Sequence, residues 1–347
     1  MSGIPELTPV RERHRFDESA LAAYLSEHMD GDFSNVDVLQ FEGGQSNPTY
    51  LMRAGDDTFV MRKKPPGVLL KSAHAVDREH RIMTALRDTA VPVPRTFLLC
   101  EDESVIGTAF FLMEHVEGRV VPEVELPGFS PEERRALYKD FAQVLAALHS
   151  VDLKATGLEG FGREGNYFAR QISRWSKQYV ASRTEDLPEM DALMEWLPAN
   201  VPESDEVTIA HGDYRIGNCI IHPTEPRIVA LLDWELSTTG HPLGDLGYCC
   251  MGYHLPRAEL DVFPEPGSGV PNEREFVDMY CKAAGRGEID NWNFYIIFNL
   301  FRSAAIVQGV YKRGLDGNAS SEDWRRRRDE CKRVAICAWE LARKMGA

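Results

Sequence analysis

The stretch HGDYRIGN at residues 211–218, followed by ALLDWE at residues 230–235, decides the fold and chemistry that we expect of this chain. Asp213 stands three residues into a predicted turn, where its carboxylate can accept a proton from a substrate hydroxyl. Asn218 precedes an apolar strand, and Asp233 ends a second apolar strand that is expected to pair with the first. An amide oxygen beside a carboxylate suits Mg²⁺, which takes few protein ligands and completes its shell with phosphate and water. A base together with a phosphate-bridging cation predicts phosphoryl transfer.

The same residues also allow a purely structural interpretation, without catalysis. His211, Asp213 and Asn218 could form a network of turn hydrogen bonds, and Asp233 could cap an element. That interpretation accounts for any one of these residues. It does not account for five positions in register ahead of a strand that ends in a carboxylate, so the pattern favours catalysis.

Composition narrows the class of protein. A chain of 347 residues can bury two substantial cores, and its net charge of −15 argues against a nucleic-acid partner. The seven cysteines are scattered and none forms a CxxC pair, which indicates reduced thiols and not disulfides or a zinc site. The N-terminus lacks the apolar segment of a secretion signal, and no stretch is expected to span a bilayer. We therefore expect a cytoplasmic protein with no membrane partner.

Secondary-structure signals divide the chain into three parts. An N-terminal helical extension (1–35) contains a short helix over 19–29. Residues 36–117 alternate apolar strands with one main helix, and a tight Gly-Asp turn joins two of the strands in a hairpin. Helical periodicity dominates residues 118–347, which also contain the two strands of the opening motif. The pattern predicts an α+β fold with a small sheet-containing lobe and a larger, mainly helical lobe.

The catalytic motif resembles that of a known family. Kinase catalytic loops read HRDxxxxN, and His211, Asp213 and Asn218 keep that spacing with Gly212 in place of the arginine. The chain resembles the aminoglycoside phosphotransferase and choline kinase-like family. Within it, the chain is similar to the branch associated with acyl-CoA dehydrogenases, on the segments GGQSNPTY, KPPG, SAHAVDREH and LLDWELSTTGHPLGD. The resemblance implies a bilobal protein kinase-like fold that binds ATP and Mg²⁺, with Asp213 as base and with Asn218 and Asp233 as metal ligands.

The resemblance also requires a cation on the third strand, paired to a glutamate on the next helix. In the strand TFVMRKK, alternation places Val60 and Arg62 on one face. Glu79 interrupts an otherwise apolar helix stripe, where an unpaired carboxylate would be costly. Arg62 is the natural partner of Glu79, in place of the lysine common in kinases. Lys63 is the alternative if the register slips by one residue.

Two further segments are expected to hold the nucleotide. EGGQSN lies where such kinases cover the phosphates, and Gly43, Gly44 and Ser46 would let backbone N–H groups approach them. FFLMEHVEG resembles a kinase hinge, in which adenine would bind the carbonyl of Glu114 and the N–H of Val116. The structural alternatives are an ordinary turn and an ordinary strand end.

Three residues around the catalytic loop refine the expectation. Arg215 stands two positions after the base, where it would neutralise charge in the transition state or form a salt bridge at the loop rim. Asp245 resembles a family aspartate that braces the loop backbone. Gly212 replaces the arginine that binds a phosphorylated activation loop in some kinases, so we expect a site that needs no phosphorylation to assemble.

The acceptor of the phosphate is left open by the sequence. The branch resemblance implies a hydroxylated small molecule such as a hydroxyacyl-CoA and a functional link to acyl-CoA dehydrogenases, whereas the acidic charge suits an amino sugar or amino alcohol. The rival hypothesis is a nucleotide-binding pseudokinase or regulatory module. A hydrolase that uses Cys249 or His241 is a distant third, because no nucleophile elbow or metal-ligand spacing surrounds them.

Overall fold

The alternation of the strands and the periodicity of the helices produce two compact units in a computed structural model, which describes residues 6–42, 47–65, 75–163, 165–204, 206–256, 265–317 and 322–347. We call them the sheet unit and the helical unit. The sheet unit comprises Met1–Phe129, Lys154–Leu158 and Arg215–Ser237. The helical unit comprises Ser130–Leu153, Glu159–Tyr214 and Thr238–Ala347. The α+β class expected from the sequence is confirmed.

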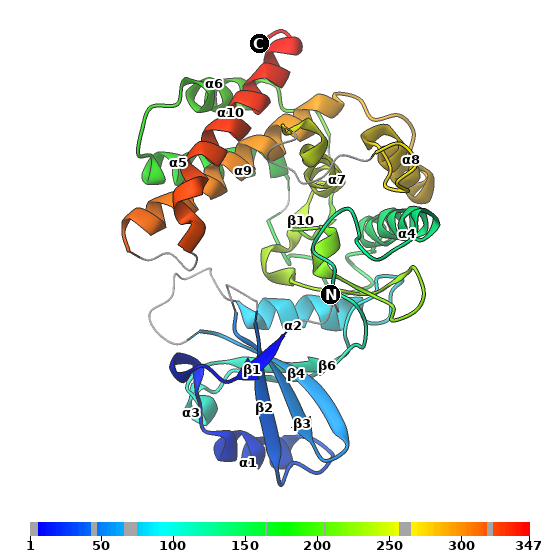
Figure 1. Ribbon diagram of the computed structural model, residues 1–347, viewed down its shortest axis with the longest axis vertical. Coiled ribbons are helices and arrows are strands. Elements are labelled where there is room, and N and C mark those ends of the chain that lie inside the picture. The colour runs from blue at the N-terminus through cyan, green and yellow to red at the C-terminus, as the bar shows by residue number, and fades with distance from the viewer. Residues whose placement is uncertain are drawn as a thin grey trace. The chain divides into compact units, whose positions relative to one another are not determined.

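The sheet unit is built around an antiparallel sheet whose described strands run in the order β1-β2-β3-β4-β6-β5 (Figure 1). A separate hairpin, β8–β9, also belongs to this unit. Its elements are β1 (Leu7–Pro9), η1 (Glu12–His14), α1 (Glu18–His28), β2 (Val36–Phe41), β3 (Thr49–Ala54), β4 (Asp57–Lys63), α2 (Val76–Leu86), β5 (Thr96–Cys100), α3 (Glu103–Ile106), β6 (Phe110–Glu114), η2 (Ile216–Asn218), β8 (Cys219–Ile221), β9 (Ile228–Leu231) and η3 (Trp234–Leu236).

Side chains that alternate along the strands bury both faces of this sheet. Phe110 and Leu112 belong to a core cluster that includes Leu21 and Leu25 of α1, so α1 covers one face. The intervening Phe111 meets the ring of His80 on α2, on the other face. The main helix of the predicted small lobe therefore packs on the sheet as expected.

The N-terminal segment differs from the separate helical extension that the sequence predicts. The helix is present as α1 and is capped by Asp17, whose carboxylate accepts the N–H groups of Ser19 and Ala20. It packs within the core of the sheet unit, and β1 adds an edge strand by pairing with β2. The sheet unit also takes in residues 215–237, which begin 98 residues after the predicted boundary at 117.

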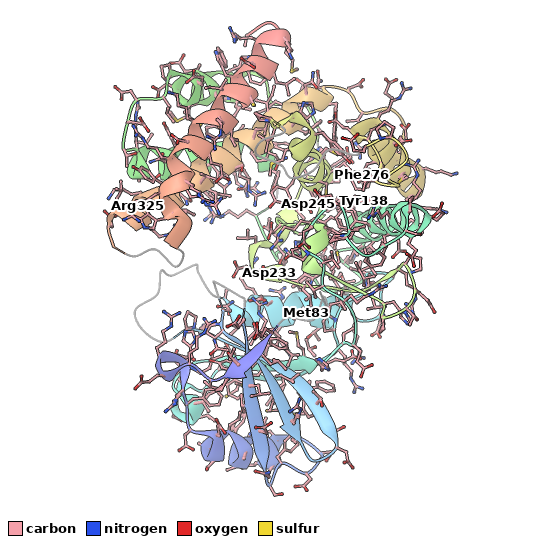
Figure 2. All side chains as sticks on the ribbon, in the orientation of Figure 1. Met83, Tyr138, Asp233, Asp245, Phe276 and Arg325 are labelled. Atoms are coloured by element: carbon pink, nitrogen blue, oxygen red, sulfur yellow. The ribbon has the colours of Figure 1, made fainter. Side chains whose placement is uncertain are left out.

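The helical unit is built around α9, which packs against α5, α7 and α10. Helix α4 begins at the predicted capping box of Ser130 and Glu133, and its Tyr138 faces Phe276 of α8 (Figure 2). The elements are α4 (Pro131–His149), α5 (Tyr167–Ser182), α6 (Pro188–Ala199), β7 (Thr208–Ala210), β10 (Thr238–Gly240), α7 (Pro242–Cys250), η4 (Met251–His254), α8 (Glu273–Ala284), α9 (Trp292–Leu315), η5 (Glu322–Arg326) and α10 (Arg327–Lys344).

Helix α9 corrects one expectation from the sequence. Among the described residues it is long and apolar enough to cross a membrane by length and composition, with a mean hydropathy of 1.2 over 18 residues. Of that window, 78% is buried inside the protein. The apolar character of α9 is therefore that of a core helix, whose surface is covered by its neighbours.

Candidate active site

The predicted catalytic motif is divided between the two units after Tyr214, so each part is described within its own unit. In the sheet unit, β8 and β9 form the predicted antiparallel hairpin, and the N–H of Leu232 donates to the carbonyl of Asn218 at 2.8 Å. Asn218 is buried. Asp233 follows β9 with a φ of 68°, a left-handed conformation that costs a residue other than glycine roughly 1–2 kcal/mol. Strain of this kind is typical of functional sites.

The predicted ion pair between Arg62 and Glu79 is present. Arg62 Nε lies 3.1 Å from Glu79 Oε2, and Glu79 is only 1% exposed. Arg62 Nη2 also lies 3.3 Å from Asp233 Oδ1, so one guanidinium faces two carboxylates. Burial raises the pKa of Glu79 to about 7, and the Arg62 charge opposes that rise. The Arg62 guanidinium thus joins β4, α2 and the residue that follows β9.

Asn47 completes this cluster and was not predicted from the sequence. Its buried Nδ2 donates to Glu79 Oε1 at 2.7 Å, so both oxygens of the Glu79 carboxylate have partners. Asn47 directly follows Gly43, Gly44 and Ser46, the predicted phosphate-covering residues, which lie outside the described residues. No local sequence signal marks an asparagine for this role, because its partner lies 32 residues away.

Lys63, the alternative cation, takes a different environment. It is next to Arg62 on β4, and strand alternation sends its side chain to the other face of the sheet. Its ammonium lies 5.7 Å from the centroid of the Phe16 ring. Burial lowers the pKa of Lys63. Of the two candidate cations, Arg62 is therefore the one that pairs with Glu79.

The predicted adenine and transition-state residues also lie in the sheet unit. Glu114 ends β6, and its carboxylate accepts the N–H of Arg95 at 3.1 Å. Val116 lies in the following loop. Gly118 then passes so close to β8 that an added Cβ would lie 2.3 Å from Ile220 Cγ2, which only glycine avoids. The adenine-binding role of Glu114 and Val116 stays a prediction.

The exposed Arg215 side chain lies over Gly217. An added Cβ on Gly217 would lie 2.6 Å from Arg215 Nη1. This places the guanidinium over the backbone of Gly217, which directly precedes the predicted metal ligand Asn218. Its role at the transferred phosphate stays a prediction.

In the helical unit, Asp245 braces the catalytic loop, as the sequence predicts. Its buried oxygens accept the N–H of His211 at 2.6 Å and of Gly212 at 2.9 Å. Burial acts to raise the pKa of Asp245, but His149, His211 and the Gly212 N–H outweigh it and hold the pKa below its usual range. Gly212 adopts a φ of 82°, so the position of the kinase arginine here requires the left-handed backbone that glycine adopts without strain.

The predicted base itself has a partner that the sequence analysis missed. Tyr248 on α7 donates its hydroxyl hydrogen to Asp213 Oδ1 at 2.5 Å. Arg302 on α9 donates to the carbonyl of Gly212, next to the base. Tyr248 could have been found, because it lies three residues after Asp245 and therefore on the same helix face. Arg302 could not, since it lies 90 residues from its partner.

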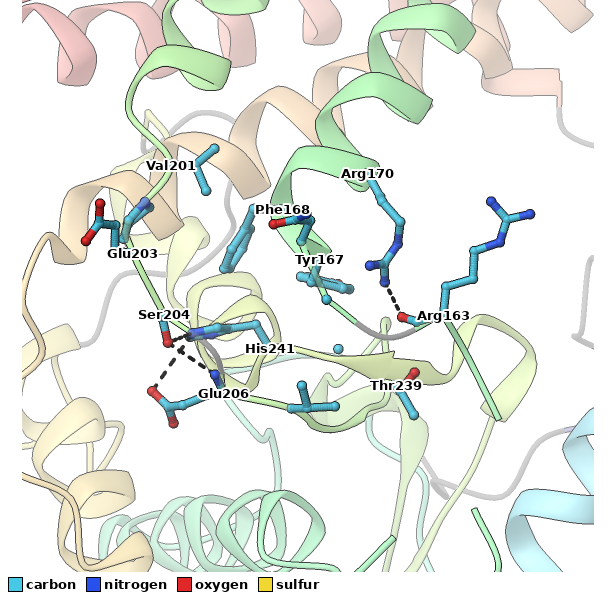
Figure 3. A pocket seen from close by; sticks show the side chains of 15 residues that line it. Arg163, Tyr167, Phe168, Arg170, Val201, Glu203, Ser204, Glu206, Thr239 and His241 are labelled. Atoms are coloured by element: carbon cyan, nitrogen blue, oxygen red, sulfur yellow. Dashed lines mark hydrogen bonds and ion pairs between the residues drawn. The ribbon is translucent and has the colours of Figure 1, made fainter. Parts of the chain in front are cut away.

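The geometry excludes His241 as the base of a hydrolase. His241 lines a cavity of about 670 Å³ in the helical unit, where its Nε2 lies 2.9 Å from Ser204 Oγ (Figure 3). Its Nδ1 accepts the N–H of Leu243 at 3.2 Å, so in the neutral ring the proton is on Nε2. His241 therefore donates to Ser204 and cannot activate it. Cys249, the other candidate, points its thiol at the carbonyl of Tyr214.

Comparison with known proteins agrees with this architecture. The model of the phosphotransferase enzyme family matches residues 37–292. Acyl-CoA dehydrogenase family member 10 of Mus musculus is 45% identical over 356 residues, which cover 99% of this chain and 33% of that protein. The chain spans a third to just under half of the length of the curated relatives that it matches.

Solved structures give the same result. A protein from Ralstonia eutropha JMP134, provisionally described as an aminoglycoside phosphotransferase, is 46% identical with a TM-score of 0.87, and the match covers 95% of this chain and 99% of that one. A spectinomycin phosphotransferase solved with ADP and spectinomycin is 13% identical with a TM-score of 0.59, covering 94% and 98% of the two chains. This second likeness concerns the fold alone.

Proposed function

Because the chain belongs to the phosphotransferase enzyme family, we propose that it is an ATP- and magnesium-dependent kinase that moves the γ-phosphate to a hydroxyl group of a small molecule. The observation that carries the proposal is the Arg62 bridge, 3.1 Å from Glu79 and 3.3 Å from Asp233. A buried cation between a strand, a helix and the predicted metal ligand is the arrangement that kinase-like folds use for the nucleotide phosphates. The spectinomycin phosphotransferase was solved with ADP, the nucleotide that this reaction would leave.

The residues present fit a magnesium ion. At its open end the hairpin β8–β9 carries the amide oxygen of Asn218, before β8, and the carboxylate of Asp233, after β9, a donor set that suits a hard cation. We assign both residues as its ligands. When bound, Mg²⁺ would neutralise charge on the β- and γ-phosphates.

The reaction then follows from the roles of the chain's own residues. The acceptor hydroxyl oxygen forms a bond to the γ-phosphorus while the bond from phosphorus to the bridging oxygen of ATP breaks, and its electrons leave on ADP. Asp213 takes the hydroxyl proton. Asp245 holds the backbone ahead of Asp213 in place, which keeps the base in one orientation. Arg215 and Arg62 supply positive charge for the phosphates.

The class of acceptor rests on separate arguments. The relatives named as acyl-CoA dehydrogenases favour a hydroxyacyl-CoA or a related hydroxy acid, and a functional link to that chemistry. The net charge of −15 favours an amino sugar or amino alcohol. We propose the hydroxyacyl class first, because the relatives match at 43–45% identity over nearly the whole chain, whereas net charge also serves solubility.

One observation favours a second candidate, a nucleotide-binding module without transfer activity. Arg62 Nη2 lies beside the carboxylate that we assign to the metal, where its charge would compete with a cation. In this alternative, Arg62 replaces the metal at Asp233 and the bound nucleotide is not hydrolysed or transferred.

The test is transfer of the labelled γ-phosphate of Mg-ATP to a panel of aminoglycosides, choline-like alcohols and hydroxyacyl-CoAs, with nucleotide binding measured in parallel by calorimetry. We expect phosphorylation of at least one hydroxylated class. ATP binding that does not depend on Mg²⁺, together with no transfer to any acceptor, would establish the second candidate. Replacing ATP with GTP in the same assay determines the nucleotide preference.

A further inference from the structure

One face of α7 contacts the catalytic loop twice. Asp245, in the first turn, accepts two backbone N–H groups of the loop. Tyr248, one turn later, donates its hydroxyl to Asp213 Oδ1 at 2.5 Å. Residues three apart lie on the same face of a helix, so this helix fixes both the loop backbone and the carboxylate of the base.

The ring of Tyr248 is itself held in place by a buried cation. The guanidinium carbon of Arg302 lies 5.4 Å from the centroid of the Tyr248 ring and 5.6 Å from that of Trp175. Arg302 is only 7% exposed and also donates to the carbonyl of Gly212. Helix α7 is tied to α9 by Asn299, whose Nδ2 donates to the carbonyl of Gly244 at 3.0 Å. The phenol that meets Asp213 therefore has little freedom to move.

We propose that Tyr248 is a positioning residue for the base, an inference that rests on the proposed function of Asp213. A carboxylate has two oxygens and rotates easily about its terminal bond. Tyr248 engages Oδ1, which restricts that rotation and fixes the orientation in which the carboxylate meets the acceptor hydroxyl. Arg302 supports this arrangement indirectly, by packing on the Tyr248 ring and by donating to the Gly212 carbonyl.

The alternative is that Tyr248 is a partly buried packing residue whose hydroxyl happens to reach Asp213. The two readings differ in what the loss of one oxygen atom does. Removal of a packing residue's hydroxyl changes stability. Removal of a positioning hydroxyl lowers the rate of transfer, while the binding of ATP is preserved.

Tyr248→Phe is the test, with Tyr253→Phe as its matched control. Tyr253 lies five residues further along and donates its hydroxyl to the carbonyl of Pro271 at 2.8 Å, so the control loses a hydrogen bond of the same kind away from the base. For Tyr248→Phe we expect kcat to fall about tenfold, with the KM for ATP unchanged within about twofold. The control should match wild type in both.

Two outcomes would overturn the inference. One is a Tyr248→Phe protein whose kcat stays within about twofold of wild type. The other is a control that loses as much activity as Tyr248→Phe. A readout without transfer separates this inference from the proposed function: the carbon-13 NMR chemical shift of the Asp213 carboxyl, assigned with Asp213→Asn. Here Tyr248→Phe should change that chemical shift, because the carboxylate loses its hydrogen bond, even if no acceptor is phosphorylated. An unchanged chemical shift would refute the role of Tyr248.

Discussion

Replacing Asp245 with asparagine tests how strongly the fold depends on the carboxylate that holds the loop of Asp213. Asp245 is 1% exposed, and its oxygens accept the N–H groups of His211 and Gly212 at 2.6 and 2.9 Å. Asparagine has nearly the same shape but one acceptor oxygen, and its NH₂ group would face a second donor. The buried N–H that loses its partner costs about 1–3 kcal/mol, and the remaining bond loses its charge assistance, about 1 kcal/mol. We therefore expect Asp245→Asn to lower the free energy of unfolding by about 3 kcal/mol.

Urea unfolding followed by tryptophan fluorescence measures this loss. Five of the six tryptophans lie in the helical unit, so the signal reports mainly on the unit that contains Asp245. Asp186→Asn is the control, because its carboxylate is 93% exposed and its partner Arg183 also pairs with Asp191. We expect the control to keep the wild-type midpoint. A loss below about 1 kcal/mol for Asp245→Asn would refute the reasoning, because a buried unsatisfied N–H cannot cost so little.

Two other substitutions test the electrostatics of each unit. Glu79→Gln leaves the Arg62 guanidinium with one carboxylate, so it should cost about 3 kcal/mol in urea unfolding and raise the KM for ATP; an unchanged KM would contradict the role of Arg62. Burial lowers the pKa of His241 to about 4. Between pH 6.5 and pH 4 the unfolded chain therefore binds a proton that the folded chain excludes, so the free energy of unfolding decreases as the pH is lowered through this range. Through this group wild type should lose about 2 kcal/mol between pH 7.5 and 5.0. The free energy of unfolding of His241→Asn, in which asparagine can still cap α7, should fall by about 2 kcal/mol less over that range. Equal losses in both proteins would contradict the lowered pKa of His241.

Local chemistry in the sequence predicts some of the features of this molecule well. The capping box at Ser130 starts α4, because both of its hydrogen bonds are made within four residues. The Arg62–Glu79 pair follows from strand alternation, helix periodicity and the cost of a buried unpaired carboxylate. Asp245 as the brace came from the family resemblance, and its two hydrogen bonds confirm it.

Other features depend on contacts between distant segments and leave no local pattern. Asn47 meets Glu79 across 32 residues, and Arg302 meets Gly212 across 90. The strand β1 is only three residues long and contains a proline, which suits an edge strand but weakens the strand signal in the sequence. The inclusion of residues 215–237 in the sheet unit depends on the β8–β9 hairpin, whose Leu231 N–H donates to the carbonyl of Pro92.

The central claim is that this chain transfers the γ-phosphate of ATP with Asp213 as the base. Its most direct test compares the rate of phosphate transfer by wild type and by Asp213→Asn, at saturating Mg-ATP and with the best acceptor of the panel, while calorimetry confirms that both proteins bind ATP equally. Asparagine preserves the shape of the side chain but cannot take the proton, so we expect kcat to fall by about 100-fold or more. An Asp213→Asn protein that transfers phosphate at the wild-type rate would contradict the account.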